Sequence, residues 1–172
     1  MSSSAISRVL RSRRGASRLA SEAALIAASL AVLAIPAQAR SGGISLSAAW
    51  SRATAPRAEI GAGFLTIRNT AARTDRLLSA ASPKATRVEI HTMTLSGGVM
   101  RMRPLANGLE VPSGSTLALA PGGNHFMFIG LKSPMKVGER VDATLQFQRA
   151  GTVRVTFTVG GPGASGPMTG DQ

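Results

Sequence analysis

The last third of the chain alternates apolar and polar residues with a period of two, and this pattern limits the fold more than any other feature of the sequence. In 141–147 the odd positions are apolar and the even ones polar, and 153–159 repeats the alternation. Successive side chains of a strand point to opposite faces of a sheet, so both segments predict strands with one buried face. Gly151 lies between them and predicts a hairpin.

Shorter segments upstream carry the same signal. We expect strands at 44–47, 61–68, 75–80 and 87–93. Trp50, the only tryptophan, is expected in the core. Because the chain beyond the first 39 residues shows short strands at regular spacing and no clear helical pattern, we predict an all-β fold, a Greek-key β-sandwich.

The first 39 residues predict a cleaved secretory signal peptide. Five arginines precede an apolar run at 23–35, which is broken only by Ser29, and Ala37-Gln38-Ala39 fits a cleavage site. A spanning helix needs about 20 apolar residues, more than this run offers, although an uncleaved anchor is the alternative interpretation. The sequence leaves open whether export is general or twin-arginine. We expect a periplasmic protein.

Cleavage after Ala39 would leave one domain and a less basic chain. Five arginines and one glutamate leave with the leader, so the net charge falls from +12 to +8. The basic residues are dispersed and aromatic residues are scarce, which argues against nucleic acid as a partner. No later apolar run approaches spanning length, so no membrane span is expected in the mature chain. We expect a β-sandwich domain at 40–159 and a disordered, Gly- and Pro-rich tail at 160–172.

The sequence contains no cysteine. A blue-copper centre is thereby excluded, since it needs a Cys thiolate as a strong ligand. There is no Cys nucleophile, no Gly-rich phosphate loop with its lysine, and no close pair of carboxylates suited to acid–base work. We therefore do not expect an enzyme.

Both histidines lie within 88–127, together with four of the seven methionines. His91 is followed two residues later by Met93, and His125 by Met127. Thioether sulfur is a soft donor that suits Cu(I), and imidazole suits several transition metals. A set of His and Met without carboxylate or thiolate is a poor site for zinc, calcium or magnesium. The pattern predicts a Cu(I) site.

The spacing of these residues resembles the H-x10-M-x21–22-H-x-M signature of the PCu(A)C family of exported copper chaperones. Ten, twenty-two and one residues separate His91, Met102, His125 and Met127. The flanking segments 98–104 and 121–131 also fit, and the similarity runs from 44 to 159.

The resemblance implies a cupredoxin-like sandwich that binds Cu(I) through these four side chains. It further implies a metallochaperone that carries copper to the CuA centre of cytochrome c oxidase during assembly. The partners would be subunit II of the oxidase or another copper chaperone. We expect a monomer.

Strand periodicity predicts which side chains share a face. Glu89 and His91 should face away from a core formed by their neighbours, and we expect both histidines to point outward, within reach of a transient partner. Met100 and Met102 share one face, so alternation alone does not choose between them. Met93 is a reserve ligand on the face of His91.

The alternative of a different class is a structural or adhesion-type β-sandwich whose His and Met are incidental. Such a domain should bind Cu(I) no better than a sandwich without these residues.

Overall fold

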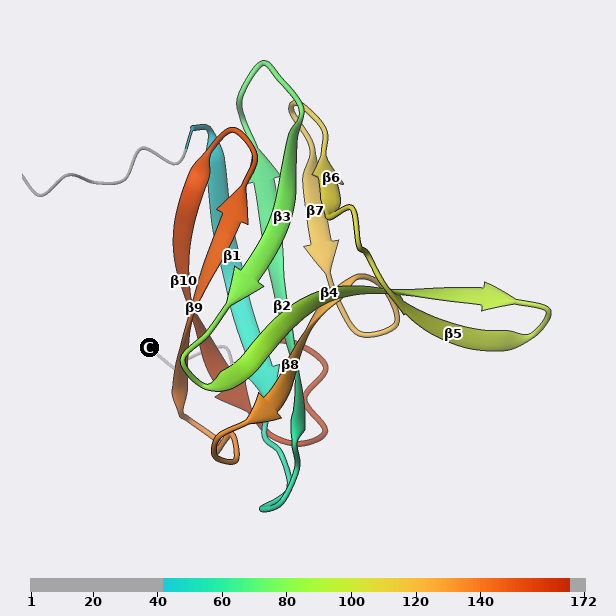
Figure 1. Cartoon of the computed structure of the whole chain (residues 1–172), viewed down its shortest axis with the longest axis vertical. Coiled ribbons are helices and arrows are strands. Elements are labelled where there is room, and N and C mark those ends of the chain that lie inside the picture. The colour runs from blue at the N-terminus through green and yellow to red at the C-terminus, as the bar shows by residue number, and fades with distance from the viewer. Residues whose placement is uncertain (1–41, 168–172) are drawn as a thin grey trace, which may run out of the picture. The chain divides into compact units, whose positions relative to one another are not determined.

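A computed structural model describes residues 42–167 of the chain. The predicted leader and residues 168–172 lie outside this part. Ten strands were found in it, and no helix: β1 (Ile44–Arg52), β2 (Ile60–Asn69), β3 (Asp75–Ala81), β4 (Ala85–Ser96), β5 (Val99–Pro104), β6 (Leu109–Val111), β7 (Thr116–Leu119), β8 (His125–Leu131), β9 (Arg140–Phe147) and β10 (Gly151–Gly160). The all-β prediction is confirmed, and each expected strand is present with extended ends (Figure 1). No described helix is long and apolar enough to cross a membrane.

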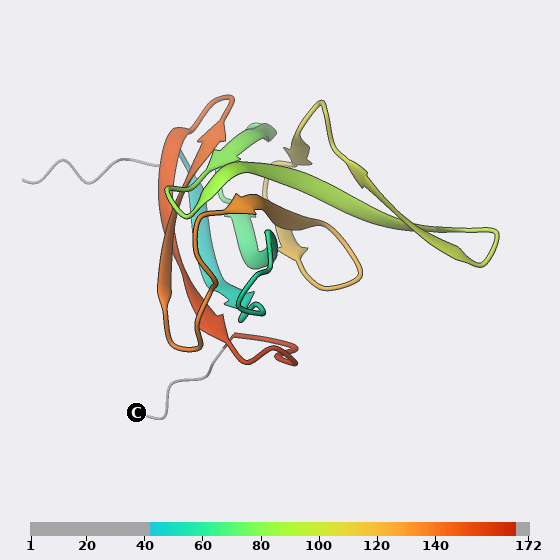
Figure 2. The same cartoon turned by 60° about the horizontal axis from the view of Figure 1, so that its bottom comes forward.

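Seven strands close into a ring. The order β4-β8-β2-β1-β10-β9-β3 returns to β4 through a single bridge between Ala80 and Val88. All neighbours in this ring are antiparallel except β1 and β10, which run parallel. Two short strands lie outside the ring order. β6 pairs with β3, and β7 pairs with β2. Figures 1 and 2 show the ring as two packed layers.

The interior is filled by the side chains that the period-two pattern assigned to it. Along β9 the four odd positions are buried and the even ones are more exposed. The largest fully buried side chains come from seven strands and from the segment between β8 and β9, and they include Phe126, Phe128, Phe147 and Phe157. Phe157 meets both Phe126 and Phe128 edge-to-face, with ring centroids 6.0 and 5.6 Å apart, an arrangement that aromatic rings prefer. Trp50 is buried, as predicted.

One close packing contact explains a glycine in the middle of β2. A Cβ at Gly63 would lie 2.7 Å from a ring carbon of Phe128 and 3.1 Å from one of Phe157. Only a residue without a side chain lets β2 approach this aromatic cluster.

The segment after β10 contacts the sandwich at Ala164. Arg52 Nε donates to the carbonyl of Ala164 at 2.8 Å, and the amide of Ala164 donates to the carbonyl of Gly161. The disordered tail expected at 160–172 therefore has a hydrogen-bonded turn in its first part.

The β4–β5 hairpin extends away from the ring. Only residues 85–91 of β4 pair with β8, whereas the pairing with β5 runs from His91 to Ser96. The outer half of this hairpin therefore has no third strand beside it (Figures 1 and 2).

The aromatic cluster predicts where the stability of the sandwich resides. Phe157→Ala should lower the free energy of unfolding by about 3–5 kcal/mol, because it opens a cavity among buried rings. Ile60→Ala, at a β2 position that is 51% exposed, should cost less than about 1 kcal/mol. Urea unfolding followed by tryptophan fluorescence measures both. Equal losses in the two variants would contradict this assignment of the core.

Candidate metal centre

The two histidines face each other across the β4–β8 pair. His91 is directly opposite His125 in the register, and their ring centroids are 6.0 Å apart. Their neighbours Ile90 and Phe126 are buried in the core. Because successive residues point to opposite faces, both imidazoles lie on the outer face of the sheet, as the alternation predicted.

The projecting hairpin brings a thioether to this pair. Met102 on β5 is directly opposite Met93 on β4, and its Sδ lies 3.2 Å from Nε2 of His125. Met100 is opposite Leu95, two residues farther along the hairpin. The structure thus places Met102, and not Met100, against a histidine.

Met127 completes the set of predicted ligands on the same face. It follows His125 by two residues and is opposite Glu89 on β4 and Ala62 on β2. Its side chain is half-buried and lines a surface hollow with Arg52 and Pro162. All four predicted ligand residues therefore lie on one face of the β5-β4-β8 strands.

Both histidines lie on the predicted outer face, but neither is open to solvent. His125 is 5% exposed and the side chain of His91 is 12% exposed. The reason is the hairpin, which lays Met102 on His125, and the ring of Phe64, whose centroid is 6.4 Å from that of His125. Alternation along a strand tells which face a residue is on, but not what covers that face.

Trp50 and Arg52 support this aromatic side of the site. The Trp50 and Phe64 rings are 4.5 Å apart, and the Arg52 guanidinium lies 5.9 Å and 5.7 Å from their centroids, respectively. A guanidinium over two rings makes favourable cation–π contacts. His125 therefore packs near Phe64, and Phe64 in turn packs against Trp50 and Arg52.

Hydrogen bonds define the proton position on His125. Its Nδ1 is 2.9 Å from the carbonyl oxygen of Gly123, which can only accept, so Nδ1 carries the proton. In the neutral ring, Nε2 then presents a lone pair toward Met102 Sδ. Two electron-pair donors facing each other at 3.2 Å with no proton between them are arranged to share a metal ion.

The turn before β8 fixes the carbonyl that orients His125. The amide of Gly123 donates to the carbonyl of Ala120 at 3.0 Å, and Gly122 has a φ of 82°. With Pro121 at the second position of the turn, a positive φ at the third position is that of a type II turn.

His91 is held in the opposite tautomer by Glu89, a residue that the sequence did not single out as functional. Nε2 of His91 lies 2.8 Å from Oε2 of Glu89. Hydrogen bonds from His91 and then from Arg87 hold the pKa of Glu89 below its usual value, so the carboxylate is ionised and only accepts. The proton therefore lies on Nε2 of His91.

This arrangement leaves Nδ1 of His91 without a partner. The atom is buried and is the only such side-chain nitrogen or oxygen lacking a hydrogen bond in the described part of the chain. A buried polar atom without a partner costs about 1–3 kcal/mol. A metal ion can take this lone pair, with Glu89 as the carboxylate that orients a ligating histidine, or it can replace Glu89 at Nε2. The Glu-x-His spacing on a strand is the sequence signal from which this contact could have been predicted.

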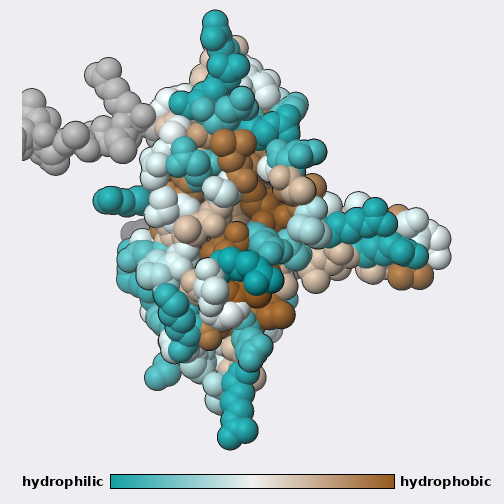
Figure 3. All heavy atoms as spheres, viewed as in Figure 1, coloured by the Kyte–Doolittle hydropathy of each residue, from teal (hydrophilic) through white to brown (hydrophobic). Residues whose placement is uncertain are grey.

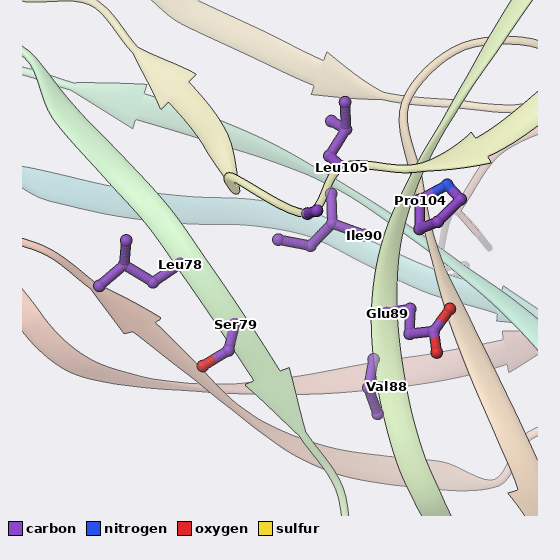
Figure 4. A pocket seen from close by; sticks show the side chains of 8 residues that line it. Leu78, Ser79, Val88, Glu89, Ile90, Pro104 and Leu105 are labelled. Carbon is purple, nitrogen blue, oxygen red and sulfur yellow. The ribbon is translucent and has the colours of Figure 1, made fainter.

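The donor set is soft. Among the described residues no group of three or more His, Cys, Asp or Glu could hold a metal ion. The side chain that contacts His125 Nε2 is instead the thioether of Met102. The hollow shown in Figure 4 lies beside β4 but does not include either histidine. In that view the Glu89 carboxylate points away from Leu78 and Ser79, the residues across the hollow.

The hydrogen bonds predict opposite tautomers for the two histidines. Two-bond 1H–15N correlation spectra, recorded above the pH range where imidazole protonates, should show His91 as the Nε2–H form and His125 as the Nδ1–H form. Glu89→Leu should remove the preference at His91 and leave His125 unchanged. A wild-type His91 with its proton on Nδ1 would contradict the role assigned to Glu89.

The fold has counterparts among solved structures. The copper-bound PCuAC domain from PmoF2 superimposes with a TM-score of 0.60 at 26% identity, over 70% of this chain and 95% of that domain. DR1885 from Deinococcus radiodurans, solved with Cu(I), gives a TM-score of 0.55 at 36% identity, over 67% of this chain and 76% of its own. The predicted cupredoxin-like sandwich is confirmed, and its solved counterparts are PCuAC domains.

The sequence comparisons extend over the same region. A protein named putative lipoprotein Lxx21020, from Leifsonia xyli subsp. xyli, is 34% identical over 117 residues, which is 68% of this chain and 69% of that protein. The family described as "Putative lipoprotein LpqE-like" matches residues 44–159, from the first residue of β1 to the next-to-last residue of β10. The chain belongs to this LpqE-like family.

Proposed function

We propose that this domain binds one Cu(I) ion through His91, Met102, His125 and Met127 and carries it outside the cytoplasm. The observation that carries the proposal is the contact at 3.2 Å between Met102 Sδ and Nε2 of His125, the nitrogen that carries no proton in the neutral ring held by Gly123, beside two histidines that are nearly covered. The copper-bound PmoF2 domain and the Cu(I) form of DR1885 support the choice of metal.

The chemistry of the donors favours Cu(I) over other metals. Thioethers are neutral and soft, and zinc, calcium and magnesium prefer thiolate, imidazole or oxygen ligands. Without a thiolate, the site lacks the strong ligand of blue-copper electron-transfer centres. Holding and releasing copper is the role that remains for such a donor set.

The structure of the domain suits a carrier. The buried core contains none of the four proposed ligands except the adjoining His125, and its largest side chains pack on one another without any metal. A carrier has to stay folded after it gives up its ion, and a core that is independent of the site provides this. We propose delivery to the CuA centre of cytochrome c oxidase, with subunit II or another copper chaperone as the partner, on the resemblance to the PCu(A)C family.

We propose that the chain is exported and that cleavage after Ala39 releases the domain. Its membership in a family described by the name "Putative lipoprotein LpqE-like" supports export. The basic leader and the Ala37-Gln38-Ala39 pattern support cleavage at this place. Mass spectrometry of the secreted or periplasmic protein should find Arg40 at the N-terminus. An exported chain that retains residues 23–35 would favour the anchor.

The proposed ligand set predicts different effects for two substitutions of methionine. Met102→Leu keeps the bulk but removes the donor, and should weaken Cu(I) binding by at least about tenfold, since even outer-shell partners are worth 10–100-fold. Met135→Leu removes a thioether that is buried away from the site, where it accepts from Ser51 Oγ, and should leave the affinity unchanged. Anaerobic competition against a chromophoric Cu(I) chelator measures both.

X-ray absorption on the Cu(I) complex provides the matching structural readout. We expect mixed nitrogen and sulfur neighbours in the wild-type protein and fewer sulfur neighbours in Met102→Leu. A spectrum with only nitrogen and oxygen neighbours would overturn the ligand assignment. Weak binding that is equal in the wild type and in the Met102→Leu variant would instead favour a structural β-sandwich whose His and Met are incidental.

A further inference from the structure

The projecting β4–β5 hairpin exposes more large apolar side chains than any other described element. Of the seven exposed large hydrophobic residues in the described part of the chain, four lie between positions 95 and 102: Leu95, Val99, Met100 and Met102. Figure 3, in the same view as Figure 1, shows apolar surface on this hairpin next to hydrophilic side chains. Exposed apolar surface that is gathered on one element commonly marks a binding or interaction site.

The register separates the two faces of the hairpin. Met93 is opposite Met102, and Leu95 is opposite Met100, so these four side chains form one apolar face. Arg101 and Arg103 alternate with the methionines and lie on the other face. Three thioethers therefore share a face of the hairpin that carries no charged side chain between positions 93 and 102.

This face continues directly into the histidine pair. Met93 follows His91 by two residues on β4, and Met102 contacts His125. Met102 is 48% exposed and Met100 is 49% exposed, whereas both histidines are nearly covered. An ion bound at the histidines therefore meets solvent or a partner mainly through the sulfur of Met102, and Met100 lies farther out on the same face.

We propose that Met93, Met100 and Met102 form a Cu(I) transfer position, through which copper reaches and leaves the His91–His125 site. The proposal rests on the function proposed above and adds a path to the same site. Met102 belongs to both positions. The ion therefore exchanges one ligand at a time and stays coordinated by the protein as it moves between them. The exchange is a substitution of neutral ligands, in which copper remains Cu(I) and no proton or electron is transferred.

The distances along the sheet allow this sharing. Directly opposite residues have Cβ atoms about 5 Å apart, which applies to Met93 and Met102. Residues two apart on one strand are separated by about 7 Å, which applies to Met100 and Met102. The unbranched methionine side chain has three rotatable bonds and adapts to irregular geometry, so the three sulfurs can converge on one ion and separate again.

The first experiment detects the transfer position in the absence of the main site. His91→Ala/His125→Ala protein with 13C-labelled methionine methyl groups is titrated anaerobically with Cu(I) as its acetonitrile complex. The methyl signals of Met93, Met100 and Met102 should shift together, and the buried Met135 should not move. Adding Met100→Leu should weaken this response. No shift at Met93 and Met100, or an equal shift at Met135, would overturn the proposal.

The second experiment uses the otherwise intact protein, so it does not depend on the folding of the double variant. Stopped-flow measurements follow Cu(I) moving to and from a chromophoric chelator. Met100→Leu, which keeps the bulk, should slow capture and release together by several-fold. Leu95→Met adds a sulfur directly opposite Met100 and should accelerate both. Val99→Ala removes exposed apolar surface at the hairpin turn without touching a sulfur, and should change neither rate.

The outcomes separate this proposal from the function on which it rests. Unchanged rates in Met100→Leu, with tight Cu(I) binding by the wild type, would overturn the transfer position alone. Faster release without slower capture would also overturn it, because Met100 would then be a ligand of the main site. A wild-type protein that does not bind Cu(I) would overturn the proposed function itself.

Discussion

The pairing of β4 with β8 is the constraint on which the rest of the site depends. Val88 and Ile90 are buried opposite Phe128 and Phe126, and this packing fixes the register of the two strands. A slip of one residue would turn every side chain of a strand to the opposite face. The apolar packing inside the sandwich therefore sets the position of His91 opposite His125 outside it, without any contribution from a metal.

A second layer of polar contacts then orients the two rings. A backbone carbonyl from a glycine turn holds His125, and the ionised Glu89 holds His91, so the rings present different nitrogens as electron-pair donors. The two contacts differ in strength, because a hydrogen bond to a charged acceptor is about twice as strong as a neutral one. His91 is consequently the more firmly oriented ring, and His125 depends more on the side chains packed around it.

Much of the fold followed from the sequence, because the strands of 141–147 and 153–159 carry a strict period of two. The face of each histidine was predictable for the same reason. The parallel pairing of β1 with β10 and the closure at Ala80–Val88 were not, since alternation within a strand contains no information about its neighbours. The contact of Met102, and not Met100, with His125 and the covering of His125 depend on how the β4–β5 hairpin packs, which alternation does not give. In the sequence, Met102 was distinguished from Met100 only by the family resemblance.

The isolation of the outer hairpin has a consequence for the energetics of the chain. From Thr92 to Arg103 its backbone hydrogen bonds are made between β4 and β5 alone. These residues can open and close without breaking any pair of the seven-stranded ring, so their opening free energy is separate from, and smaller than, that of global unfolding. Such an opening lifts Met102 from His125 while the aromatic interior stays intact. The domain thus combines a closed frame with one element that can open without disturbing it.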